Sequence, residues 1–177
     1  PDAGRKGIVP FDKKQEAVMT IFGKTLSEYI AFCKPFLILI PVVGLVKLVL
    51  SLSGTPNATT WWFSISALTW VAVLYYSVRV HTSSFGSYRH LLVICVLLNL
   101  SAQIISILGI VIAILSASDN VYVYALGEHE RTWSHVAAHL FFGTTAGSVV
   151  AWLGGSLVLA MTRKITGVSV RPHRSSV

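Results

Sequence analysis

Residues 91–116 read LLVICVLLNLSAQIISILGIVIAILS and contain no charged side chain. A helix needs about 20 apolar residues to cross the hydrocarbon core of a bilayer, and this stretch is longer than that. A helix of the same length on the surface of a soluble protein would carry a polar face, which this stretch lacks. We therefore predict that it spans a membrane.

Three further long apolar stretches, nearly free of charged residues, occur along the chain. The four predicted spans cover residues 30–52, 61–80, 91–116 and 135–161. Charged residues make up only 12% of the chain, about half the share in a typical soluble domain, and most of them lie between or beyond these stretches. The sequence predicts an all-α membrane protein in which residues 30–162 form one up-down-up-down antiparallel bundle of four transmembrane helices.

The basic residues indicate how the chain is oriented. The net charge is +7, and lysines and arginines gather before the first span, between the second and third spans, and after the fourth. In a four-span protein these regions share one side, whereas Asp119, Glu128 and Glu130 fall on the other. Because basic loops stay in the cytoplasm, we predict a bacterial inner-membrane protein with both termini cytoplasmic and with Tyr122 at the opposite headgroups. Without a basic soluble domain, a nucleic-acid partner is not expected.

The segments outside the predicted bundle are polar. Residues 1–29 are predicted to form a polar tail and an amphipathic helix, because apolar residues recur at steps of three and four between Asp12 and Phe32. This helix would lie on the cytoplasmic surface of the lipid bilayer or dock to a partner subunit. Lys34 and Pro35 are expected to mark the bend at which the chain enters the bilayer. Residues 163–177 form a basic cytoplasmic tail.

Four polar side chains inside the predicted spans require partners: Lys47, Asn99, Gln103 and Ser148. Lys47 can extend to the outer interface, pair with a carboxylate such as Asp119, or bind an anionic ligand. Asn99 and Gln103 share a face of the third span, and Ser148 lies at a matching depth on the fourth. Because an unpaired amide in hydrocarbon is costly, we predict interhelical hydrogen bonds, with a transport pathway as the alternative.

The fourth span carries a stripe of residues at four-residue steps. The stripe begins with His135 and His139 and continues with the small residues Gly143, Gly147, Ala151 and Gly155. Small residues at this spacing allow helices to pack closely in lipid, either within one chain or between chains, and here we expect a partner subunit. The same groove would also admit a flat cofactor.

His135 and His139 lie one helical turn apart. Together with His129 or Glu128 they form a candidate metal site of the zinc or copper type. Alternatively, one of them ligates a tetrapyrrole (haem or chlorophyll) or contacts a quinone or bound lipid, or both simply hydrogen-bond the neighbouring loop and headgroups. No enzyme motif is present: Val136 follows His135, where a zinc peptidase requires glutamate.

Three hypotheses about function follow from these features. The first is a non-catalytic accessory subunit of a larger inner-membrane complex, respiratory or photosynthetic, held to other subunits by the fourth span and both tails. The second is a membrane protein that binds a metal or another cofactor through His135 and His139. The third is a small oligomeric channel lined by Asn99, Gln103 and Ser148.

Overall fold

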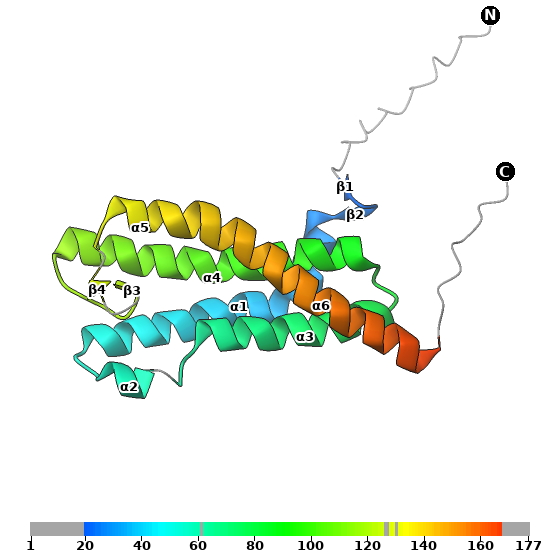
Figure 1. Cartoon of the computed structure of the whole chain (residues 1–177), viewed down its shortest axis with the longest axis horizontal. Helices are drawn as coiled ribbons and strands as arrows, with labels where there is room; N and C mark the ends of the chain where they lie inside the picture. Colours follow the sequence, from blue (N-terminus) through cyan, green and yellow to red (C-terminus); the bar gives the residue numbers. More distant parts are fainter. Residues whose placement is uncertain (1–19, 61, 126–127, 130, 168–177) are drawn as a thin grey trace, which may run out of the picture.

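A computed structural model describes residues 20–60, 62–125, 128–129 and 131–167 of the chain. Four long helical segments lie side by side along its longest axis (Figure 1). They are α1 (Leu26–Leu52), α3 (Ile65–Thr82), α4 (Tyr88–Ser116) and a final segment made of α5 (Trp133–Ala138), the π-helix η1 (His139–Gly143) and α6 (Thr144–Thr166). The short helix α2 (Asn57–Thr60) lies between α1 and α3.

Three of these segments are long and apolar enough to cross a membrane. They are α1, α4 and the final segment Trp133–Thr166. The spans predicted at residues 30–52, 91–116 and 135–161 are therefore confirmed as helices of suitable length and composition. The predicted span at residues 61–80 corresponds to α3, an 18-residue helix that does not reach the same hydropathy.

The segment before α1 forms a hairpin instead of the predicted amphipathic helix. Strand β1 (Thr20–Ile21) pairs antiparallel with β2 (Lys24–Thr25). The turn consists of Phe22 and Gly23, which both have positive φ, as a tight two-residue hairpin turn requires. The helix prediction is thus wrong for residues 20–25, and its earlier part lies outside the described residues.

Helix α1 begins at Leu26 because Thr25 and Glu28 form a capping box. The Thr25 side chain accepts a hydrogen bond from the Glu28 N–H, and the Glu28 carboxylate accepts one from the Thr25 N–H at 2.7 Å. From there the helix runs without interruption through Pro35 and Pro41 to Leu52. The bend predicted at Lys34 and Pro35, where the chain would enter the bilayer, stays a prediction; the helix itself begins nine residues before Lys34, at its cap, and continues through Pro35, as helices in a membrane tolerate proline.

Helix α4 lies at the centre of the structure and packs against α1, α3 and α6. Its largest fully buried side chains are Leu91, Ile94, Leu98 and Ile110. Helix α6 crosses from α4 to α3 (Figure 1) and contacts both. The four helical segments therefore enclose a common core in which polar side chains of different segments can meet.

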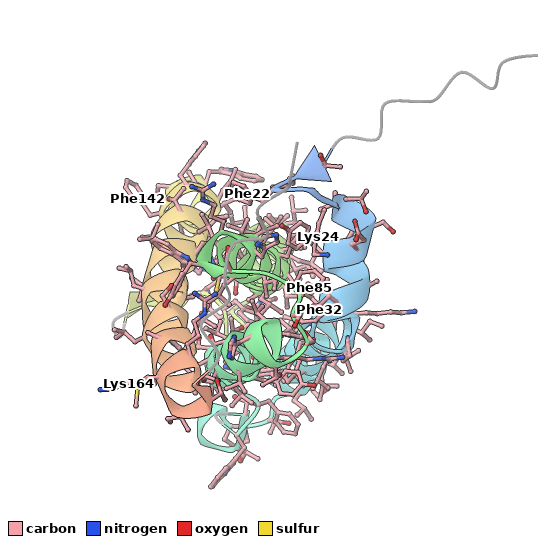
Figure 2. All side chains as sticks on the ribbon, turned by 90° about the vertical axis from the view of Figure 1, so that its right-hand side faces the viewer. Phe22, Lys24, Phe32, Phe85, Phe142 and Lys164 are labelled. Carbon is pink, nitrogen blue, oxygen red and sulfur yellow. The ribbon has the colours of Figure 1, made fainter. Side chains whose placement is uncertain are left out.

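The end of the structure that carries the hairpin is held together by aromatic rings and cations. Phe32 of α1 stacks on Phe85 of the α3–α4 turn with ring centroids 3.9 Å apart. The Lys24 ammonium lies 4.5 Å from the centre of the Phe85 ring, and the three residues sit next to one another in Figure 2. The Tyr29 hydroxyl donates a hydrogen bond to the Ile21 carbonyl at 3.0 Å. These contacts fix the hairpin onto the helices.

Candidate ligand cavity

A cavity of about 330 Å³ lies between α1, α3, α4 and the final helical segment. Most of the polar residues that the sequence analysis identified within the spans line this cavity. The side chains of Lys47, Asn99, Gln103 and His139 line it, together with Gly147 and Ala151. Apolar lining comes mainly from Ile65, Trp70 and Val73 of α3 and from Val150 of α6. The cavity is thus lined by both polar and apolar side chains.

Asn99 joins α4 to the final segment across the cavity wall. It is only 8% exposed. Its Nδ2 donates to the carbonyls of Gly143 and Thr144, both at 2.9 Å, and lies 3.2 Å from the Ser148 hydroxyl. The predicted interhelical pairing of Asn99 with Ser148 is therefore observed. Because two carbonyls fix the amide nitrogen on this side, Asn99 Oδ1 is left without a hydrogen-bond partner among the described residues.

The π-helix η1 brings His139 to the cavity. Here the Thr144 N–H donates to the His139 carbonyl, five residues earlier, so the turn is wider than an α-helical one. Asn99 donates to the carbonyls of Gly143, the last residue of this turn, and of Thr144, which follows it. Such single π-turns are frequent at functional sites. The sequence contained no signal for it, because the predicted stripe assumed a regular α-helix.

His139 and Gln103 form a pair in the cavity wall. The His139 Nδ1 lies 2.6 Å from Gln103 Oε1. An amide oxygen only accepts hydrogen bonds, so Nδ1 carries the hydrogen and the second ring nitrogen of a neutral imidazole remains an acceptor. The Gln103 amide nitrogen keeps both hydrogens available, as no described residue accepts from it. Both side chains can therefore bind a ligand in the cavity.

His135 is buried beside His139, with ring centroids 5.0 Å apart, but it is not part of the cavity wall. Among the residues that the structure describes, no three histidine, cysteine, aspartate or glutamate side chains are grouped closely enough to hold a metal ion. The side chains of Glu128 and His129 lie outside the described part of the chain. The metal site built from these four residues therefore stays a prediction.

Lys47 brings a positive charge to the cavity. It is half-buried, and its Nζ lies 5.9 Å from the centre of the Tyr122 ring. The predicted pairing with Asp119 is not observed, because that carboxylate lies 3.2 Å from Arg131 Nε. In the described part of the chain, no carboxylate lies within ion-pair distance of Lys47.

Tyr122, from the loop between α4 and α5, completes the wall. Its hydroxyl donates a hydrogen bond to the Gly44 carbonyl of α1 at 2.8 Å, and its ring covers Gly109 of α4. Burial raises the pKa of the phenol, which therefore remains a donor. The sequence predicts Tyr122 at the headgroups; the structure shows that its loop folds back onto α4, where Asn120 Nδ2 donates to the Gly109 carbonyl at 2.7 Å. This contribution to the site was missed, since the sequence does not reveal how a loop folds back.

The small-residue face of the final segment lies against this chain's own helices. A Cβ at Gly143 or Gly147 would lie 2.8 Å from the amide of Gln103 or Asn99, respectively, and one at Gly155 would lie 2.7 Å from the Ser77 hydroxyl of α3. Ala151 is likewise buried. The face that we expected to contact a partner subunit is thus occupied by α3 and α4, and it makes room for the two amides of the cavity.

The chain matches no protein-family model, no curated protein and no solved structure. Its function is therefore inferred from the geometry of the cavity.

Proposed function

We propose that the chain crosses a bacterial inner membrane four times, as an up-down-up-down bundle with both termini cytoplasmic. Helix α3 supports a fourth span because its 18 residues rise about 27 Å, close to the ~30 Å thickness of the hydrocarbon core. The charges support the orientation. The hairpin, the α3–α4 turn and the end of α6 lie at one end of the structure (Figure 1), and this end carries Lys24, Arg89 and Lys164.

Cysteine labelling tests this topology. In a background with Cys33 and Cys95 replaced by alanine, we expect Ser83→Cys and Lys164→Cys to react with a membrane-impermeant maleimide from the cytoplasmic side only. Ser53→Cys and Ser118→Cys should react from the opposite side only, because these residues are exposed at the other end of α1 and α4. Labelling of Ser83→Cys and Ser53→Cys from one common side would contradict the four-span topology.

We further propose that the protein binds a small ligand, or the headgroup of a lipid, in the cavity. The observation that carries this proposal is the convergence of Lys47, Asn99, Gln103 and His139 on one cavity of about 330 Å³. Leaving several polar groups unpaired inside a membrane is costly, so their presence in one place favours a bound partner. Ligand sites combine apolar walls with a few such groups, and their volumes run from about 300 to 1,000 Å³. A volume at the lower limit favours a headgroup over a tetrapyrrole.

Filling the cavity is expected to abolish binding. Ser106 of α4 lines the cavity, and its hydroxyl donates only to the Ala102 carbonyl of its own helix. A Ser106→Leu variant should therefore fold but bind a single-chain amphiphile at least about tenfold more weakly, since its larger side chain occupies the space. Radiolabelled dodecanoate and dodecanol, titrated onto the protein in nanodiscs, provide the measurement.

Ser101→Leu is the matched control, because Ser101 is also half-buried on α4 but does not line the cavity. It should bind both probes as the unaltered protein does. Binding that is equal in Ser106→Leu and the unaltered protein would refute the proposed binding site. The accessory-subunit and channel hypotheses stay predictions. The small-residue face that favoured the accessory-subunit hypothesis packs against this chain's own helices.

A further inference from the structure

We propose, on the basis of the binding function above, that the ligand is a single-chain amphiphile whose carboxylate or phosphate headgroup is held by Lys47. Lys47 lines the cavity with its Nζ 5.9 Å from the centre of the Tyr122 ring, and the carboxylates of Glu28 and Asp119 are paired with Lys24 and Arg131. No carboxylate belongs to the cavity wall formed by the described residues. Lys47 therefore has no carboxylate partner among the described side chains, and an anionic group is the natural partner for its charge.

Further hydrogen-bond donors surround the same space. The Gln103 amide nitrogen has two hydrogens to donate, because the Gln103 oxygen is occupied by His139. Helix α3 begins at Ile65, and Ser64, Ile65 and Ser66 line the cavity. The N-terminus of a helix carries unpaired N–H groups and a partial positive charge, both of which favour an anion. An ammonium, an amide and a helix terminus thus contribute to one anion-binding region.

The apolar residues that line the cavity indicate that the ligand carries an apolar tail. Trp70 of α3 and Val150 of α6 line the cavity and are 41% and 55% exposed. The cavity wall is therefore continuous with the apolar surface of α3 and α6. Gly154 allows this arrangement, because a Cβ there would lie 2.8 Å from the Trp70 ring. An alkyl chain attached to a headgroup in the cavity would pass Trp70 and Val150 to reach the lipid.

Competition between amphiphiles with the same tail tests whether the site prefers an anionic headgroup. Dodecanoate, dodecyl phosphate and dodecanol share one tail, and acetate has the headgroup without it. The comparison uses only the binding that is lost in Ser106→Leu. For this binding, we expect dodecanoate, dodecyl phosphate or both to bind at least tenfold more tightly than dodecanol. The anion that binds more tightly identifies the headgroup as carboxylate or phosphate. Acetate should not displace dodecanoate at comparable concentrations.

Two variants of Lys47 test whether this residue holds the headgroup. Lys47→Met should abolish the preference for the anions over dodecanol, whereas Lys47→Arg, which retains the charge, should preserve it. Equal binding of dodecanoate and dodecanol to the unaltered protein would overturn the headgroup assignment while leaving the cavity as a binding site. Unchanged dodecanoate binding in Lys47→Met would overturn the role of Lys47. Absence of any binding sensitive to Ser106→Leu would overturn the proposed function itself.

Discussion

An Asn99→Asp variant is expected to lose about 3 kcal/mol of its free energy of unfolding, the scale of leaving a buried charge or polar group uncompensated. Asn99 is 8% exposed, and its Nδ2 donates to the backbone carbonyls of Gly143 and Thr144. An aspartate places a second oxygen where this nitrogen lies. Two carbonyl oxygens would then face a carboxylate oxygen in a largely apolar interior, and the η1 turn would lose its attachment to α4.

Asn99→Leu provides the matched control, because it removes the same hydrogen bonds without adding an acceptor. Interhelical hydrogen bonds in membranes contribute on the order of 0.6 kcal/mol each, so this variant should lose only about 1–2 kcal/mol. Unfolding in detergent, followed by circular dichroism, should therefore rank the unaltered protein above Asn99→Leu and Asn99→Asp last. The deficit of Asn99→Asp should shrink at low pH, because a protonated carboxyl regains one donor hydrogen.

The opposite ranking would contradict this reading of the amide. If Asn99→Asp were as stable as the unaltered protein at neutral pH, the nitrogen of Asn99 could not be the atom that faces the two carbonyls. A comparable loss in both variants, independent of pH, would point to side-chain volume instead of hydrogen bonding.

Hydropathy and charge were sufficient to predict the helices and the polar residues among them. The long apolar stretches identified three helical segments, and depth along the spans matched Asn99 with Ser148. These properties depend on length and composition, which a single sequence displays directly. Lys47, Gln103 and His139 were also singled out, but their convergence on one cavity was not predicted.

The features that were not predicted are a π-turn, a hairpin and a loop that folds back. The periodicity of apolar residues in the sequence does not reveal such features. The stripe was predicted on a uniform α-helix; Gly143, Gly147 and Gly155 do share one side, which faces α3 and α4, but the π-turn at His139–Gly143 was not predicted. Residues 20–25 were predicted to be part of an amphipathic helix, although Gly23 permits a hairpin turn. Tyr122 was assigned to the interface from its residue type alone, while Asn120 and Gly109 determine where it lies.

A Gly109→Ala variant is expected to be destabilised, although alanine is the better helix former. In an ordinary helix this substitution gains about 0.5–1 kcal/mol. Here a Cβ on residue 109 would overlap Cδ2 of the Tyr122 ring and lie 2.8 Å from its Cγ. The ring cannot move away freely, because the Tyr122 N–H donates to Asn120 Oδ1 at 2.9 Å and Asn120 Nδ2 donates to the Gly109 carbonyl. Overpacking of this kind costs about 1–3 kcal/mol, which exceeds the gain in helix propensity.

A double-mutant cycle with Tyr122→Ala separates the clash from other effects. Removing the ring eliminates the two shortest contacts and leaves only the Tyr122 Cβ, 3.0 Å from the added Cβ. Gly109→Ala should therefore cost little, or even stabilise the helix, in the Tyr122→Ala background, giving a coupling energy of about 1 kcal/mol or more. Equal costs in the two backgrounds would show that Tyr122 does not lie over Gly109. In that case Tyr122 would not occupy the position from which it lines the cavity.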